Sequence, residues 1–136
     1  MEGLKTGSKR DTGSLLMWER RGRSFLGAAN GVVGILHCLL GHTDEEWTTL
    51  EEAMPCVKQV VQQAIDSLAD FRHESGNLRA SLDAYEEDKF ADWSHGSAGY
   101  CLLLIKSTEV FGDERYLNLA KDVAEQVLWG RRAQRK

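Results

Sequence analysis

The sequence contains one short motif twice, N-G-V-V-G at residues 30–34 and H-G-S-A-G at residues 95–99. Both copies carry two glycines three positions apart, and an apolar run follows each. Gly31 corresponds to Gly96 and Gly34 to Gly99, with an offset of 65 residues. Self-similarity at a fixed spacing in a helix-rich chain indicates one supersecondary unit used twice, and each such unit needs a neighbour to bury its apolar face.

The apolar spacing around the two motifs predicts helices and no strand. A capping box of Thr43 and Glu46 opens one helix, which Pro55 interrupts, and Asp113 is the expected N-cap of the last helix. We predict helical segments at residues 29–41, 43–54, 55–71, 96–111 and 113–128. Trp47, Tyr100 and Trp129 lie on apolar stripes and are expected in the packing.

These segments predict an all-α fold made of two helix hairpins, at about residues 25–71 and 90–130, within one domain at 15–130. Residues 72–92 carry polar and acidic side chains, including Ser75-Gly76-Asn77, and are expected to form a long surface loop. We expect residues 1–14 to form a flexible N-terminal tail and residues 131–136 a basic tail.

Composition excludes several classes of function. The 136 residues have a formal net charge of −4, which argues against general binding of nucleic acid. Three cysteines without a secretory leader indicate a reducing, intracellular compartment. The apolar runs are shorter than the roughly 20 residues that span a bilayer, so no transmembrane segment is predicted.

The paired glycines allow two interpretations. They remove side chains from one face of a helix start, so a neighbouring backbone can pack closely against it. Alternatively, the bare helix N-terminus faces a cavity, where its unpaired N–H groups hold an anion or a substrate.

Four motifs together resemble the eukaryotic LanC-like proteins, relatives of the bacterial lanthionine synthetase cyclases. Residues 25–36 resemble the family's Y-L-G-A-A-H-G-L-A-G-I-L segment, and residues 75–77 its S-G-N loop. Residues 92–99 resemble its W-C-H-G-A-P-G motif, and residues 110–117 its V-F-x-x-x-x-Y-L motif. The resemblance implies an α/α toroid of seven helix-hairpin layers, of which this chain would supply about two. We therefore expect a fragment, a truncated gene model or a decayed copy, with open layer edges that favour self-association.

The resemblance implies zinc-dependent addition of a thiol to dehydroalanine or dehydrobutyrine, with glutathione or a dehydrated peptide as partner. In the family, zinc is held by the cysteine of W-C-H-G and by a Cys-His pair in the next layer. Ser94 occupies that cysteine position here, and a hydroxyl is a poor zinc ligand at neutral pH. We therefore predict no metal and no cofactor for this chain.

The resemblance also implies the residues that would line a cavity. His95 is the candidate catalytic residue, which would orient a substrate or act as an acid or base; the alternative is a residue that caps a loop. Adjacent residues are not expected to bring an imidazole onto a hydroxyl, so Ser94 and His95 are not predicted to form a nucleophile pair. The cavity-lining set is Asn30, Gly31, Gly34, Trp93, His95, Gly96 and Gly99.

Two functions remain open. The first is a LanC-like protein that is inactive on its own, and the second is a non-catalytic helical interaction or scaffold module, which the serine at position 94 favours. We expect a cytoplasmic protein. The family implies a peripheral position at the plasma membrane as the alternative, but Met1-Glu2-Gly3 provides no N-terminal lipid signal.

Overall fold

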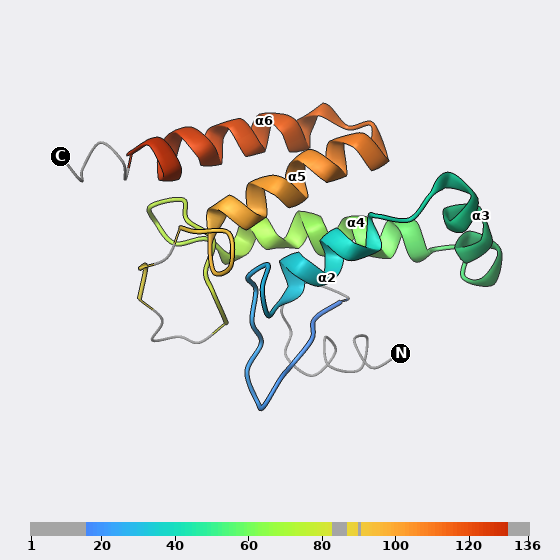
Figure 1. The fold of residues 1–136 in the computed structure, drawn as a ribbon, viewed down its shortest axis with the longest axis horizontal. Coiled ribbons are helices and arrows are strands. Elements are labelled where there is room, and N and C mark those ends of the chain that lie inside the picture. The colour runs from blue at the N-terminus through green and yellow to red at the C-terminus, as the bar shows by residue number, and fades with distance from the viewer. Residues whose placement is uncertain (1–15, 83–86, 90, 131–136) are drawn as a thin grey trace.

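The computed structural model describes residues 16–82, 87–89 and 91–130, which form helices joined by loops (Figure 1). The predicted all-α class is confirmed, because β-pairing among the described residues is limited to isolated bridges. The predicted tails, at residues 1–14 and 131–136, lie outside the described residues. The elements are α2 (Val32–Leu39), α3 (Asp44–Ala53), α4 (Val57–Ser67), the 3₁₀ turn η1 (Leu68–Phe71), α5 (Ser97–Phe111), α6 (Glu114–Val123) and the π-helical turn η2 (Ala124–Trp129).

The first hairpin consists of α2 and α4, with α3 at the far end between them (Figure 1). Thr43 and Glu46 form the predicted capping box: Thr43 N–H donates to Glu46 Oε2 over 2.7 Å, and Glu46 N–H donates to Thr43 Oγ1 over 3.2 Å. The helix that begins there ends at Ala53, two residues before Pro55.

The second hairpin consists of α5 and α6. Gly112 ends α5 with φ of 64°, in the left-handed region that favours glycine, and its N–H donates to the carbonyl of Thr108. Asp113 then accepts the N–H of Arg115 over 3.0 Å and caps α6 as predicted.

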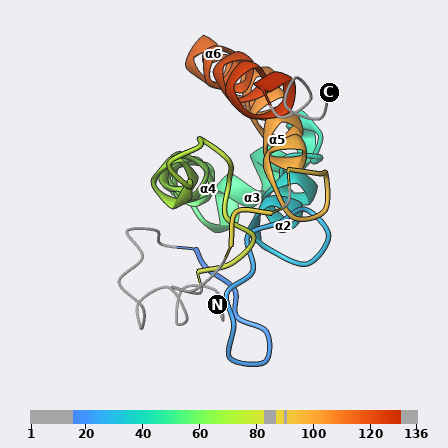
Figure 2. The same ribbon diagram turned by 90° about the vertical axis from the view of Figure 1, so that its left-hand side faces the viewer.

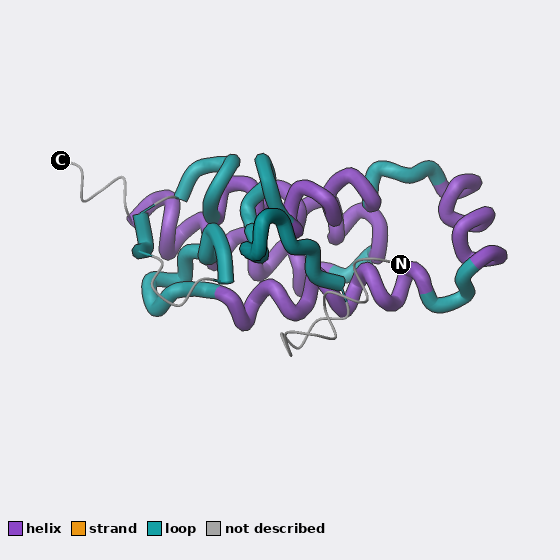
Figure 3. The backbone as a smooth tube through the Cα atoms, turned by 90° about the horizontal axis from the view of Figure 1, so that it is seen from below, coloured by secondary structure: helices purple, strands orange, loops and turns teal. Residues whose placement is uncertain are grey.

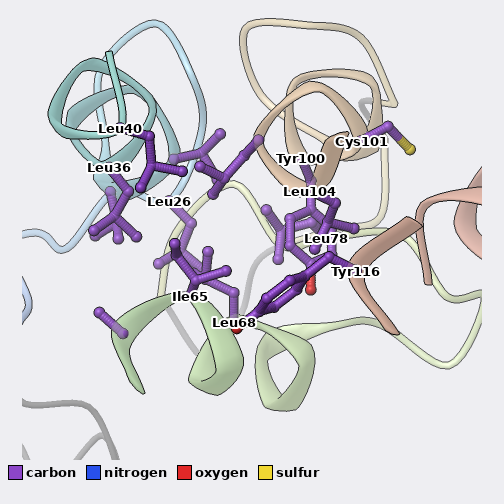
Figure 4. Close-up of a cluster of buried hydrophobic side chains, with 14 of the residues drawn as sticks. Leu26, Leu36, Leu40, Ile65, Leu68, Leu78, Tyr100, Cys101, Leu104 and Tyr116 are labelled. Atoms are coloured by element: carbon purple, nitrogen blue, oxygen red, sulfur yellow. The ribbon is translucent and has the colours of Figure 1, made fainter. Parts of the chain in front are cut away.

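The two hairpins share a hydrophobic core. Helix α5 contacts α2 on one side and α6 on the other, and α4 runs beside this row of helices (Figures 1 and 2). The tube view shows most of the helices lying along the long axis of the molecule, with α3 across that axis at one end (Figure 3). Side chains from both hairpins meet between α2, α4 and α5 (Figure 4), and neither hairpin buries its apolar face alone. The almost fully buried core side chains include Leu26, Leu36, Leu40, Ile65, Leu68, Leu78, Tyr100, Leu104 and Tyr116.

Helix α2 begins later than its apolar pattern predicts, at Val32 instead of Ala29. The N–H of Ala29 donates to the carbonyl of Ser94 over 3.3 Å. The N–H groups of Val32 and Val33 donate to carbonyls in the preceding loop. Because these residues bond outside the helix, the first turn forms only after Gly31.

The predicted surface loop at residues 72–92 is wrong for its first half. This segment packs against the chain before α2, which buries Asn77, Leu78 and Ser81. The N–H of Leu26 donates to the carbonyl of Ala80 over 2.7 Å, and a bridge joins Phe25 to Ser81. Residues 83–86 and 90 lie outside the described residues.

Two of the three aromatic residues expected in the packing are confirmed there. Trp47 and Tyr100 are buried, whereas Trp129, in the π-helical turn η2, is 68% exposed. Leu102 and Ile105 of α5 are also exposed. No helix among the described residues is long and apolar enough to cross a membrane.

The tight packing of α5 predicts that Gly99→Ala destabilises the protein. A Cβ at Gly99 would overlap the carbonyl oxygen of Trp93 and lie 2.9 Å from Cβ of Ala28. Backbone cannot move aside as a flexible side chain does. We expect the free energy of unfolding, measured by urea denaturation, to fall by about 2 kcal/mol.

Gly130→Ala is the matched control. Gly130 has a helical φ of −57°, and an added Cβ would meet nothing closer than 3.9 Å. Its free energy of unfolding should stay within about 0.5 kcal/mol of the unsubstituted protein. Equal stabilities for the two variants would contradict the packing described here.

Candidate functional site

The two glycine motifs lie against each other at the starts of α2 and α5. Gly31 is the N-cap of α2 and Gly96 the N-cap of α5, so each helix begins directly after the first glycine of its motif. The loop before α2 contacts the loop before α5, since Gly27 lies directly against the carbonyl of Ser94. The two motifs therefore form one structural unit.

Close packing accounts for the paired glycines. A Cβ at Gly31 would overlap the backbone of Phe25, and one at Gly34 would overlap the carbonyl of Ala28. At Gly99 the backbone of Trp93 fills the same space. The first of the two interpretations thus describes these helix starts, and a cavity-lining role for the set stays a prediction.

Asp92, Ser94 and His95 form a hydrogen-bonded chain of side chains just before α5. Ser94 Oγ lies 2.8 Å from Asp92 Oδ1 and 2.6 Å from His95 Nδ1, and the backbone N–H of His95 donates to Asp92 Oδ1 over 2.9 Å. The Ser94 hydroxyl, followed by the backbone N–H of His95, holds the pKa of the Asp92 carboxyl below its ordinary value. Asp92 is therefore an anion at neutral pH.

This geometry corrects the expectation that neighbouring residues cannot join their side chains. The loop before α5 brings the imidazole of His95 onto the hydroxyl of Ser94. The arrangement still differs from a catalytic triad. In a triad the carboxylate bonds to the far side of the imidazole, whereas Asp92 bonds to the hydroxyl of Ser94.

Asn77 caps α5 from a different segment of the chain. Its Oδ1 accepts the backbone N–H of Ser97 over 3.1 Å and the Ser97 hydroxyl over 2.7 Å. The hydroxyl oxygen of Ser97 in turn accepts the N–H of Leu78 over 2.9 Å. The N-cap residue Gly96 has no side chain to cap the helix, so this buried amide supplies the missing acceptor.

The S-G-N loop holds Asn77 in place. Asn77 Nδ2 donates to Asp88 Oδ1 over 2.9 Å, and the Ser75 hydroxyl donates to Asp88 Oδ2 over 2.5 Å. Gly76 has φ of +90°, and its carbonyl accepts from Arg72 Nε over 2.7 Å. Sequence reasoning missed Asp88 and Ser97. The glycine N-cap of α5 was the available signal, because a helix start without its own capping side chain needs an acceptor from elsewhere.

The other predicted site residues lie near the two helix starts. Asn30 precedes α2; its side-chain oxygen is buried and makes no hydrogen bond with the described residues. Trp93 is 53% exposed beside Ser94. The side chain of His95 is 41% exposed, so a small molecule in solution can reach it.

The sequence matches the family model for lanthionine synthetase C-like proteins over residues 3–134. The chain belongs to the LanC-like family. It is 27% identical over 129 residues to LanC-like protein GCL1 of Arabidopsis thaliana, covering 95% of this chain and 28% of the relative. It is 31% identical over 119 residues to glutathione S-transferase LANCL1 of Danio rerio, covering 87% of this chain and 27% of that relative. The LanC-like chain thus spans about a quarter of the length of these relatives.

The zinc that the LanC-like resemblance implies does not fit the donor atoms present. Position 94 supplies a hydroxyl already engaged by Asp92 and His95. The thiol of Cys101 is buried against the carbonyl of Ala120. Within residues 16–82, 87–89 and 91–130, no three histidine, cysteine, aspartate or glutamate residues gather in a way that could hold a metal ion.

The capping role of Asn77 predicts a large loss of stability in Asn77→Ala. The substitution leaves the buried N–H of Ser97 and the Ser97 hydroxyl without their acceptor. An unsatisfied buried donor costs about 1–3 kcal/mol, so we expect a loss in that range by urea denaturation.

Asn118→Ala is the matched control, because Asn118 is exposed on α6. Its stability should change by less than about 0.5 kcal/mol. An Asn77→Ala variant as stable as this control would show that the S-G-N loop does not hold the start of α5.

Proposed function

We propose that this LanC-like chain provides a thiol-binding site at the start of α5 and does not itself carry out zinc-dependent thiol addition. The site is the polar group of Asp92, which is exposed, and Ser94 and His95, which are half-buried. Its proposed ligands are glutathione or a dehydrated peptide bearing a thiol. The observation that carries the proposal is the hydroxyl of Ser94, which bonds to its two neighbours where the family motif has a cysteine.

The chemistry of position 94 supports the absence of catalysis. Zinc activates a thiol by stabilising its thiolate, and it takes thiolate, imidazole or carboxylate ligands. A neutral serine hydroxyl is none of these. In addition, no group of three histidine, cysteine, aspartate or glutamate residues that could hold a metal ion is found among the described residues.

The imidazole of His95 supports binding of a thiol. A ring nitrogen can accept a hydrogen bond from an S–H group or take up its proton. One relative is named glutathione S-transferase LANCL1, and glutathione is a tripeptide that contains a thiol. This supports glutathione as the first compound to test.

A non-catalytic scaffold module is the second candidate. Leu102 and Ile105 lie on the exposed face of α5, and apolar side chains there favour packing against another helical layer. Binding of glutathione distinguishes the two candidate functions, because a scaffold without a ligand site should not bind this compound.

Zinc analysis and a thiol-addition assay test the catalytic part of the proposal. The purified chain should contain much less than one zinc per molecule and should not add glutathione to a dehydroalanine peptide. Ser94→Cys alone should not restore the reaction, because one thiolate does not make a zinc site. One tightly held zinc per chain, or measurable addition by the unsubstituted protein, would contradict the proposal.

Calorimetric titration with glutathione tests the binding part. We expect His95→Ala to weaken binding at least about tenfold, the effect of losing one hydrogen bond to a charged or strongly polar group. His42→Ala is the matched control, because His42 lies before α3, away from the site. Equal binding by both variants would place the ligand elsewhere, and no binding by the unsubstituted chain would favour the scaffold.

A further inference from the structure

The hydrogen bonds of Ser94 determine where its only side-chain proton lies. Its Oγ is 2.8 Å from Asp92 Oδ1 and 2.6 Å from His95 Nδ1. An ionised carboxylate accepts hydrogen bonds and cannot donate one. The proton of the Ser94 hydroxyl therefore lies towards Asp92. The opposite arrangement would leave two electron-rich oxygens 2.8 Å apart with no proton between them.

The tautomer of His95 follows from this count of protons. With its proton towards Asp92, Ser94 Oγ presents only lone pairs to the imidazole, so His95 Nδ1 must donate. A neutral imidazole carries one N–H. The lone pair of the ring is then on Nε2. The tautomer of a histidine is set by the hydrogen bond that one of its nitrogens makes.

We propose that Asp92 and Ser94 are positioning residues that fix His95 as the Nδ1–H tautomer, so that Nε2 accepts a hydrogen bond or proton from a thiol-bearing ligand. The tautomer follows from the hydrogen bonds among these three side chains. The thiol ligand rests on the proposed function.

Backbone hydrogen bonds hold the side chains of Asp92, Ser94 and His95 in position. The N–H of His95 donates to the same Asp92 Oδ1 over 2.9 Å, and the N–H of Gly96 donates to the carbonyl of Asp92 over 3.1 Å. The carboxylate of Asp92 is therefore fixed beside the Ser94 hydroxyl.

The direction of these hydrogen bonds excludes the Ser94 hydroxyl as a nucleophile activated by His95. The imidazole donates to this hydroxyl and therefore cannot remove its proton.

Nitrogen NMR of the whole 136-residue chain tests the tautomer directly. Spectra are recorded about two pH units above the ordinary histidine pKa of about 6.5, where the ring is neutral. His95→Gln identifies the His95 signals by their loss. We expect Nδ1 to show the shift of a protonated nitrogen and Nε2 that of an unprotonated one.

Substitutions at position 94 separate positioning from folding. Ser94→Ala removes the hydroxyl that links His95 to Asp92. His95 should then change to the Nε2–H tautomer that free histidine prefers in water. Ser94→Thr keeps a hydroxyl and should retain the Nδ1–H tautomer. Thr48→Ala removes an exposed hydroxyl from α3 and should change nothing. A predominant Nε2–H tautomer in the unsubstituted protein, or one unaltered by Ser94→Ala, would overturn the proposal.

Titration of the same samples with glutathione, and with S-methylglutathione as control, tests the ligand. Glutathione should shift the Nε2 signal of His95, and the methylated compound, which has no S–H group, should shift it much less. If His95 is the Nδ1–H tautomer but its Nε2 signal shifts with neither compound, the tautomer is supported. The thiol ligand of the proposed function is then contradicted. Equal shifts with both compounds would overturn the role of Nε2 as acceptor from the thiol.

Discussion

The close approach of two loops, one before α2 and one before α5, is the constraint on which the rest of the structure depends. Gly27 lets the first loop lie on the carbonyl of Ser94, and Gly99 lets α5 start against the backbone of Trp93. Glycine in a helix costs about 1 kcal/mol relative to alanine. The shared core between the two hairpins, which this contact makes possible, compensates for that loss.

The same contact determines what the start of α5 can do. Its first N–H groups are engaged by the protein, because Asn77 accepts from Ser97 and the carbonyl of Ala91 accepts from Ala98. A helix N-terminus occupied in this way does not offer its N–H groups to an anion. Chemistry at this end therefore depends on the side chains just before the helix, and Ser94 and His95 are placed there by bonds to Asp92.

Much of the fold could be predicted from the sequence, because helix periodicity and caps are local properties. Thr43, Asp113 and the glycine before α5 mark helix boundaries that depend on a few neighbouring residues. The burial of Asn77 could not be read in this way, since its partner Ser97 is 20 positions away and the segment around it is polar. The bond between Ser94 and His95 was also missed, because it depends on the turn that the backbone makes around Asp92.

Amide hydrogen exchange at Ser97 tests most directly whether the start of α5 is fixed by its contacts with distant segments. The N–H of Ser97 is buried and bonded to the side chain of Asn77, outside the helix itself. It should exchange only when the whole protein unfolds, as slowly as the amides of Leu103 and Leu104 in the middle of α5. Exchange as fast as that of an ordinary frayed first turn would contradict the account.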